Sequence, residues 1–441
     1  MWPPASSDSG RSESSIVLGL APCSDAGSAS RPRSSRSRAR RDPQTLLRRS
    51  HWAPPRARCC SPHCAWPPIR SSRSTARNRA APSGLTSPTP LASAAARAQQ
   101  AFLREQYAPR ARTEGSLSSL PDGKNCYAAS LRAQTSVQAD VDSIMRNARR
   151  DLDRITAQLA PLVLELTGER DVSRGVIQLR SDPRFTFPSR DSVLPAYQAM
   201  TTRASQLIGK VVAEFGPESV TVSPYPEFQE RADLPPQYIR ARTDGSRPAQ
   251  FLVNLSRTER MSVANAVAHE AYPGHHLQLT AERRGPVIHP VMRTLSFGGF
   301  IEGWGAYSEQ LGDEMGLYVT PLDRAGYLVH ALDIAVAAYL DIGYHTHGWT
   351  RKDLADTMLV LGGRPQAMAE AYADRHAATP GQLATYYIGS EAIRSYREKA
   401  QRALGSRFDS PQFHREVLKD GTVTLASLGA KVDRWIATRR R

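Results

Sequence analysis

Apolar residues recur at three- and four-residue spacing over most of the chain from Ala101 onward, which is the periodicity of an amphipathic α-helix. The clearest stripe lies in residues 137–160, which we predict to form one long helix. A kink or break is expected at Pro161, because proline lacks the backbone donor. From residue 262 almost to Arg441, helical patterns follow one another with short breaks. The sequence therefore predicts a mainly α fold.

A different pattern separates the two helical regions. Three short β-prone runs, at residues 220–222, 237–240 and 250–253, alternate with proline-rich loops and a Thr-Asp-Gly turn. They predict a small antiparallel β-sheet placed just before the helix that begins near residue 262. An edge strand of this sheet could bind an extended peptide through main-chain hydrogen bonds, or the edge could be covered and purely structural.

The first 96 residues show neither pattern. They are rich in Ser, Pro, Arg and Ala and hold few aliphatic side chains, so they cannot bury enough apolar surface to offset the entropy of ordering. We predict that residues 1–96 are disordered and that residues 97–441 form one large helical domain.

The formal net charge of +16 is concentrated in this N-terminal segment. Residues 1–100 contain 16 Arg, no Lys and four acidic residues, so the high isoelectric point says nothing about the rest of the chain. An arginine-rich arm could contact nucleic acid or an anionic surface. The absence of lysine favours the alternative that the segment is a mistranslated or misannotated start. We therefore do not expect a nucleic-acid partner.

The cysteine content and the hydropathy of the chain limit which other classes of protein it could belong to. Four of the five cysteines lie in the N-terminal segment, so no disulfide framework follows. No stretch is long and apolar enough for a signal-peptide core or a membrane span. Taken literally, the protein is cytoplasmic; it is exported if a signal peptide was lost with the true N-terminus. No pattern predicts an oligomeric state.

The densest group of ionisable side chains lies between residues 269 and 302. The run His-Glu-Ala-Tyr-Pro-Gly-His-His and the later Glu302 together supply three imidazoles and two carboxylates, as a zinc hydrolase requires. A His-Glu pair on one helical turn can supply a metal ligand, His269, and a general base, Glu270, while Glu302 can complete the ligand set from the next helix. No nucleophile elbow or reactive-cysteine pattern competes with this site.

The second histidine ligand is ambiguous. Zincin motifs place it four residues after the first, but here that position is Pro273. His275 and His276 lie about 9 and 10.5 Å further along an ideal helix than His269, so neither fits without distortion. Pro273 and Gly274 allow a bulge or an unwound turn at small cost. We favour His275, which needs the shorter displacement.

These residues resemble a bacterial family called "domain of unknown function 885". The resemblance rests on the run at 269–278, on Glu-Gly-Trp-x-x-Tyr-x-Glu at 302–309 and on Pro-Gly-Gln-x-x-x-Tyr-x-Ile-Gly at 380–389. It covers roughly residues 100–441. It implies a helical, metallopeptidase-like domain with one divalent metal, zinc by the family's zincin character, that hydrolyses peptide or small amide substrates with a metal-activated water. Carried over by position, His269, His275 and Glu302 would be the metal ligands and Glu270 the general base.

Further roles are implied around the metal. Glu309, on the same helix face as Glu302, could accept a hydrogen bond from a ligand imidazole or simply belong to a charged face. Tyr386 aligns with a family tyrosine that could donate to the oxyanion, and His345 with a position that could bind substrate; packing and helix capping are the alternatives. Arg397 could pair with a substrate carboxylate or with another helix.

Two more side chains could belong to the site, and the sequence differs from the family pattern in two ways. Tyr272 and His276 flank the proposed distortion and could line the cleft, although packing or exposure explains either one. Family members usually read Ala-Leu after Glu-Gly-Trp, whereas Gly305-Ala306 here could loosen the helix that carries Glu302. Family proteins are also longer, and their N-terminal helical portion has no counterpart in residues 1–95. A wall of the cleft could therefore be missing, and the chain could be an inactive helical scaffold or a truncated pseudo-peptidase.

Overall fold

The computed structural model describes residues 90–440 except 215–217, 231–233, 243 and 286–294. It divides into two units, Met1–Gln106 and Tyr107–Arg441. The first unit contains helix α1 (Pro90–Phe102), whose alanine-rich sequence favours helix. Most of the segment predicted to be disordered, residues 1–89, lies outside the described residues. The predicted boundary at residues 96 and 97 falls inside α1.

The second unit is mainly helical, as predicted, and holds one small sheet. Its α-helices are α2 (Gly123–Thr135), α3 (Val141–Thr167), α4 (Val172–Ser181), α5 (Val193–Leu207), α6 (Ser262–Glu270), α7 (His275–Arg284), α8 (Gly298–Met315), α9 (Pro321–Thr346), α10 (Arg351–Gly362), α11 (Gln366–Ala378), α12 (Ala384–Leu404), α13 (Ser410–Leu418) and α14 (Leu425–Arg440). Its strands are β1 (Thr221–Pro224), β2 (Gln237–Ile239) and β3 (Gln250–Val253).

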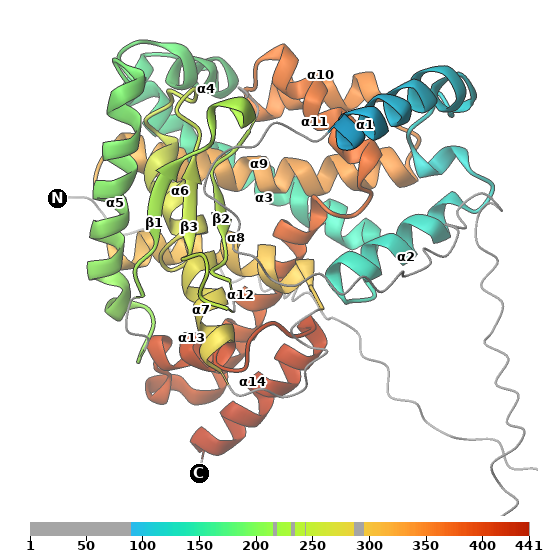
Figure 1. Cartoon of the computed structure of the whole chain (residues 1–441). Helices are drawn as coiled ribbons and strands as arrows, with labels where there is room; N and C mark the ends of the chain where they lie inside the picture. The colour runs from blue at the N-terminus through green and yellow to red at the C-terminus, as the bar shows by residue number, and fades with distance from the viewer. Residues whose placement is uncertain (1–89, 215–217, 231–233, 243, 286–294, 441) are drawn as a thin grey trace, which may run out of the picture. The chain divides into compact units, whose positions relative to one another are not determined.

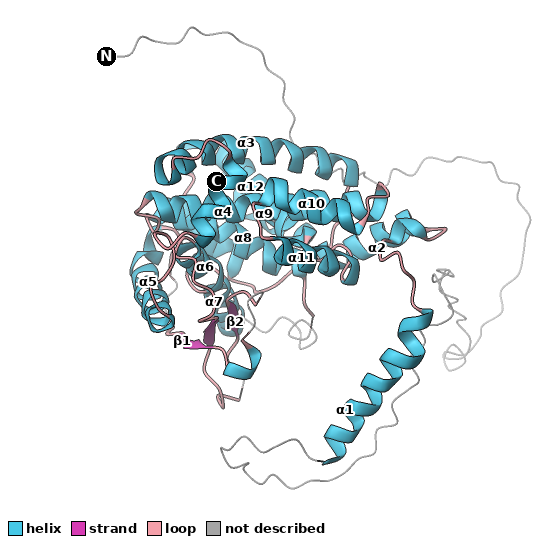
Figure 2. Ribbon diagram, turned by 90° about the horizontal axis from the view of Figure 1, so that it is seen from above, coloured by secondary structure: helices cyan, strands magenta, loops and turns pink. Residues whose placement is uncertain are grey.

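Helix α3 confirms the predicted apolar stripe but not the predicted break. It begins after Asp140, whose carboxylate accepts hydrogen bonds from the backbone of the first turn, and it buries Leu152 and Leu159. The helix continues through Pro161 to Thr167. Pro161 is exposed, so water can replace the hydrogen bond that its missing donor would have made. Figure 2 shows α3 lying along α9, on which it packs.

The sheet is mixed rather than antiparallel, which corrects one detail of the prediction. Its strand order is β1-β3-β2, with β2 antiparallel and β1 parallel to β3. The chain reverses between successive strands, so β1 and β3 run in the same direction. Because β3 lies between the other two, it meets β1 as a parallel neighbour. With the same reversals of chain direction, the sheet would be fully antiparallel only if β2 lay in the centre, in the order β1-β2-β3.

Helices α8, α9 and α12 form the centre of this unit. Helix α8 packs on α12, and α9 packs on α3, α6 and α12. The contact between α8 and α12 is close: a Cβ atom on Gly303 would lie 2.5 Å from the Cα atom of Gly389. This crossing brings the first turn of α12 next to the turn of α8 that carries Glu302.

Helix α9 is the one described helix that is long and apolar enough to resemble a membrane span. Its apolar window is 72% buried within the unit, as in the core helix of a globular fold. Length and composition alone are therefore weak evidence for a span.

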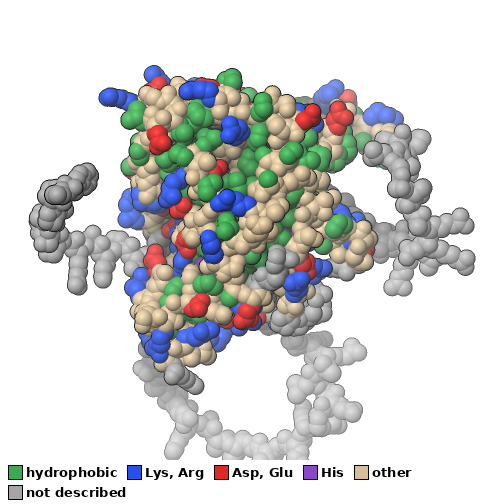
Figure 3. Space-filling view, turned by 90° about the vertical axis from the view of Figure 1, so that its left-hand side faces the viewer, with side chains coloured by type: hydrophobic (Ala, Val, Ile, Leu, Met, Phe, Trp, Pro, Cys, Tyr) green, Lys and Arg blue, Asp and Glu red, His purple; other side chains and the backbone are tan. Residues whose placement is uncertain are grey.

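The sheet lies beside α5 and α6, which pack on each other (Figure 1). One face of the molecule, viewed in Figure 3, carries Lys and Arg interspersed with Asp and Glu rather than a basic patch. This fits the sequence beyond residue 100, where acidic and basic residues nearly balance.

Candidate metal centre

The helix that carries His269 ends one residue later. Helix α6 stops at Glu270, Ala271 leaves helical geometry with φ −108° and ψ −91°, and α7 begins at His275. The Tyr272–Pro273 peptide bond between them is cis. The indole of Trp304 donates a hydrogen bond to the carbonyl of Pro273, at 2.9 Å. The predicted unwound turn is thus a complete break between two helices, held from outside by α8.

Gly274 makes the return of the chain possible. A Cβ atom at this position would lie 1.8 Å from the carbonyl oxygen of His269 and 2.5 Å from that of Ala268. Only glycine lets the backbone approach the end of α6 so closely. As a result, the ring centroid of His275 lies 4.8 Å from that of His269.

Helix α8 brings a carboxylate to these two rings. The Oε2 atom of Glu302 lies 3.8 Å from Nε2 of His269 and 3.6 Å from Nε2 of His275. One potential donor atom from each residue lies within 4.8 Å of the other two. Gly305, one turn further along α8, leaves room for the first imidazole, because a Cβ atom there would be 2.6 Å from its Nε2. Helix α8 runs through Gly305 without a break.

This donor set fits a zinc ion. Tetrahedral coordination with bonds of about 2.0–2.2 Å places neighbouring donor atoms about 3.3–3.6 Å apart. The distances from the Glu302 carboxylate to the two imidazoles are at or slightly above that range. Although burial opposes ionisation, the neighbouring imidazoles of His269 and His275 hold the pKa of Glu302 well below its usual value. The carboxylate is therefore ionised at neutral pH, as a metal ligand must be.

Hydrogen bonds on the other side of each ring fix its orientation. The Nδ1 atom of His269 lies 2.7 Å from Oε1 of Glu309, and Nδ1 of His275 lies 3.2 Å from Oε1 of Gln278. With Nδ1–H donated in each case, both Nε2 atoms are left to face Glu302.

Glu309 serves two imidazoles. His330, on α9, places its Nδ1 atom 2.9 Å from both carboxylate oxygens of Glu309. His269, Glu309 and His330 also satisfy the spacing of a three-ligand group. These nitrogen–oxygen distances are those of hydrogen bonds, so we interpret this second group as support for His269. Glu309 is 1% exposed, and despite burial its two histidine partners lower its pKa.

Glu270 lies beside the three potential ligands and is tied to the sheet. Its Oε2 atom accepts a hydrogen bond from the backbone N–H of Tyr238 in β2, at 2.8 Å. Burial raises the pKa of Glu270, while the imidazoles of His275 and His269 act in the opposite direction. A carboxylate with a raised pKa is suited to exchange a proton near neutral pH.

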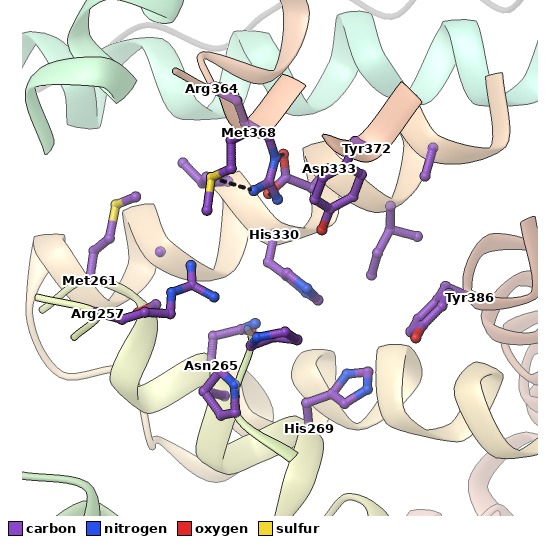
Figure 4. A pocket seen from close by; sticks show the side chains of 18 of the residues that line it. Arg257, Met261, Asn265, His269, His330, Asp333, Arg364, Met368, Tyr372 and Tyr386 are labelled. Atoms are coloured by element: carbon purple, nitrogen blue, oxygen red, sulfur yellow. Dashed lines mark hydrogen bonds and ion pairs between the residues drawn. The ribbon is translucent and has the colours of Figure 1, made fainter. Parts of the chain in front are cut away.

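His269, Glu270, His330 and Tyr386 line a cavity of about 200 Å³ (Figure 4). Tyr386 and His330 point into the cavity from α12 and α9, and His269 enters it from α6. The ring of Tyr386 stacks on that of His269, with centroids 6.0 Å apart and an interplanar angle of 27°. Burial and the nearby Glu302 carboxylate raise the pKa of Tyr386, so its hydroxyl keeps its proton.

Comparison with known proteins identifies a family. Residues 64–432 match the model of the family described as "Bacterial protein of unknown function (DUF885)". The chain belongs to this family. No curated protein matches it.

Solved structures resemble the chain in fold. A "putative lipoprotein" from Colwellia psychrerythraea is 26% identical, with a TM-score of 0.72 over 79% of this chain and 60% of that one. A "putative lipoprotein of unknown function" from Shewanella oneidensis is 20% identical, with a TM-score of 0.63 over 76% of this chain and 63% of that one. The chain thus spans about three fifths of the length of these two relatives.

An M32 carboxypeptidase from Deinococcus radiodurans R1 also matches, at 14% identity. The match covers 78% of this chain and 82% of the carboxypeptidase, with a TM-score of 0.31. A similarity of this degree carries no conclusion about activity.

Two side chains that the DUF885 resemblance assigns to the site lie elsewhere, which corrects those expectations. His345 is fully buried: its Nδ1 accepts a hydrogen bond from the backbone of Leu117, and its Nε2 donates to the carbonyl of His376. Arg397 binds both carboxylate oxygens of Glu314. Neither residue lines the cavity. In both cases partners from distant segments occupy the polar atoms.

The two residues expected to flank the break also turn away from the potential ligands. The Tyr272 hydroxyl donates to the backbone carbonyl of Glu218. The same carbonyl lies 2.8 Å from Nε2 of His276, whose Nδ1 lies 3.3 Å from the hydroxyl of Tyr238. These contacts fasten α7 to the segment before β1 and leave His275 as the histidine that approaches His269.

The sequence interpretation missed Gln278 and His330. Gln278 had a signal, since it lies three residues after His275 on the same helix face. Its amide also donates to the carbonyl of Phe300 at 3.3 Å, which links α7 to α8. No sequence signal pointed to His330, because its approach to Glu309 depends on how α9 packs against α8.

Proposed function

We propose that this protein is a metal-dependent hydrolase of peptide or related amide bonds, with one divalent ion, zinc, bound by His269, His275 and Glu302. The observation that carries the proposal is the convergence of three donor groups from α6, α7 and α8 within 4.8 Å of one another. One of them, His269, lines a cavity together with Glu270. An isolated core network would need neither the cavity nor a carboxylate next to the donors.

Each residue has a chemical role in this proposal. The two imidazoles would hold the ion through Nε2, and Glu309 and Gln278 keep their rings in place through Nδ1. Zinc, when bound, supplies Lewis acidity that makes water more acidic and polarises a carbonyl oxygen. Glu270 takes the proton from the attacking water and delivers it to the leaving amine. Its raised pKa, caused by burial, supports both transfers.

Tyr386 supplies the remaining polar group. Its hydroxyl stays protonated because burial raises its pKa. It lines the same cavity as Glu270 and stacks on His269. From this position the hydroxyl can donate a hydrogen bond to the oxyanion that forms when the carbonyl is attacked.

The test combines metal analysis with cleavage of a peptide library. The purified protein is expected to bind one zinc per chain, and His269→Ala and Glu302→Ala are expected to lose it. The exposed Glu398, which contacts only Arg402 among the ion pairs of the described residues, provides the control Glu398→Ala. A helical scaffold without a metal site predicts no stoichiometric zinc in any of these proteins.

The library digest tests the general base. Glu270→Gln is expected to keep zinc and to cleave about 10²–10⁴-fold more slowly, the usual contribution of general acid–base catalysis. A chelator should abolish cleavage by the unaltered protein. Cleavage that continues unchanged in Glu270→Gln would show that the proposed mechanism is wrong.

Cellular location belongs to the same proposal. The relatives described as putative lipoproteins support export over a cytoplasmic location. Fractionation of cells that express the native gene tests this: recovery in the cytoplasmic fraction alone would contradict export.

A further inference from the structure

The cavity is also lined by a second polar group, formed by arginines. Arg180 comes from the end of α4, Arg257 from the loop before α6 and Arg364 from the segment after α10, and all three line the same cavity as His269 and Glu270. Figure 4 shows the side chain of Arg257 directed into the cavity. The proposed hydrolysis does not use any of these side chains.

The carboxylates that pair with these arginines do not balance them. Asp333 pairs with Arg364 at 2.5 Å and with Arg180 at 3.4 Å. Arg257 pairs with Glu259 at 3.4 Å. The five side chains are 15% exposed or less. Three guanidinium groups therefore face two carboxylates in a buried setting, which leaves about one positive charge without a counter-charge among them.

Arg180 also has an unused donor. Its Nε atom is buried and has no hydrogen-bond partner among the described residues. Its side chain is 8% exposed. A buried donor without a partner is unfavourable, more so in a charged group, so it favours a ligand that supplies an acceptor. Burial and the neighbouring Arg364 lower the pKa of Arg180, as expected where positive charge is in excess.

The separation between His269 and the segment that carries Arg257 can be read from α6. Met261, Asn265 and His269 line the cavity at four-residue intervals, and Met261 lies close in sequence to Arg257. Two such intervals correspond to about 12 Å along a helix. An extended peptide advances about 3.3 Å per residue, so the span matches about three or four residues.

We infer that the arginines of the cavity bind a carboxylate of the substrate, at most about three residues away from the bond that is cleaved. This inference rests on the proposed function, and it names the substrate class for that site: short peptides with a negative charge at one end. A carboxylate carries the single charge that the arginines leave unbalanced, whereas a phosphate would bring nearly two. The guanidinium of Arg180 can donate to it through Nε.

The carboxylate could be a chain terminus or an acidic side chain, and three probes distinguish these sources. They are N-acetyl-tetraalanine with a free C-terminus, the same peptide as its C-terminal amide, and the amide with glutamate in place of the last alanine. Calorimetric titration into zinc-loaded Glu270→Gln protein measures binding without turnover. The free acid, the glutamyl amide or both are expected to bind about tenfold or more tightly than the alanyl amide.

Variants assign this preference to the arginines. On the same Glu270→Gln background, Arg180→Gln is expected to remove the preference and leave binding of the alanyl amide unchanged. Arg174→Gln is the matched control, since Arg174 is an exposed arginine on the same helix. If Arg180→Gln fails to fold, as judged by circular dichroism, Arg257→Gln provides the test.

The outcomes separate this inference from the proposed function. Equal binding of all three probes, no binding of any, or a carboxylate preference that survives in the folded arginine variant would overturn the inference. Any of these results together with chelator-sensitive cleavage would leave the proposed hydrolase intact. A carboxylate preference in a protein that cleaves no peptide would support the arginine site and contradict the hydrolase.

Discussion

The two nitrogen atoms of His269 are served by two carboxylates of one helix. Glu302 approaches Nε2, and Glu309, two turns further along α8, accepts from Nδ1. Although burial disfavours the charged ring, the neighbouring carboxylates of Glu302 and Glu309 raise the pKa of His269 well above its usual value. The spacing of seven residues puts both carboxylates on one helix face, which the sequence already indicated.

Removal of the Glu309 charge should weaken metal binding. Partners that orient a ligand imidazole typically contribute 10–100-fold to metal affinity, so we expect a loss of about that size for Glu309→Gln. Competition with a chromophoric zinc chelator measures the affinity.

The control for this prediction is Glu398→Gln, which removes a carboxylate that is 62% exposed. It should leave zinc affinity unchanged. Equal affinity in Glu309→Gln and the unaltered protein would show that Glu309 does not support the ligand.

At the residue scale, the sequence predicted what is local. His269, Glu270 and His275 come from one short run, and their chemistry limits the roles available to them. Glu302 required only the assumption that the next helix packs on the first. Arg397 could not be placed, because its partner Glu314 lies 83 positions earlier on another helix.

At the scale of elements, the break between α6 and α7 is the feature that assembles the candidate site. Proline and glycine at 273 and 274 predicted a distortion there, and the structure has a full interruption of the helix. Its exact course depends on Trp304 of α8, which binds the carbonyl of Pro273. That contact has no signature near the break, so the sequence indicated a bulge but not its geometry.

A side chain at position 274 should dismantle this arrangement. Gly274→Ala would place a Cβ atom 1.8 Å from the backbone oxygen of His269, which cannot move without displacing the end of α6. We expect a loss of about 2 kcal/mol or more in the free energy of unfolding, together with loss of stoichiometric zinc. Urea unfolding and metal analysis measure the two effects.

Gly209 provides the control for this substitution. A Cβ atom there meets nothing within 4 Å, and the residue lies in a 3₁₀ turn, so Gly209→Ala should change stability by less than about 1 kcal/mol. If Gly274→Ala were as stable and as rich in zinc as Gly209→Ala, the close approach at the break would not be needed.

The other elements follow the same logic. Helices with a continuous apolar face, such as α3, were predictable because periodicity reports which side is buried. The pairing of β1 with β3 was not, since strand order depends on contacts between segments that are nearly thirty positions apart. Local propensity cannot supply that information.

At the scale of the whole second unit, His414 connects segments that are distant in sequence. Its Nδ1 donates to the carbonyl of Val211, and its Nε2 accepts from the hydroxyl of Tyr307. Arg397 in turn donates to that hydroxyl. The imidazole is fully buried, and burial lowers its pKa to about 4.

This network predicts a pH-dependent stability. The unfolded chain binds a proton at His414 below its ordinary pKa of 6.5, whereas the folded protein does so only near pH 4. Its contribution is therefore complete above pH 6.5 and is lost as the pH falls. Between pH 6.5 and 5 the loss is about 2 kcal/mol. Urea unfolding at several pH values in this window measures it.

The comparison protein is His414→Gln. Burial also lowers the pKa values of His276 and His345, so part of the slope should remain in this variant. The difference between the two slopes belongs to His414. Identical slopes would show that the folded protein does not keep this imidazole neutral.

The hydrogen bond between Glu270 and Tyr238 has a consequence for association between molecules. Strand β2 lies at the margin of the sheet, and the backbone groups on its open side belong to alternate residues. Pro236 has no amide hydrogen, and that of Tyr238 is already taken by the carboxylate. A strand from another molecule would find few free backbone groups to pair with, so the carboxylate of Glu270 also protects this edge against aggregation. Replacement of Glu270 by alanine would leave that amide without an acceptor and favour self-association. Replacement by glutamine would not, because its side-chain oxygen can still accept the hydrogen bond.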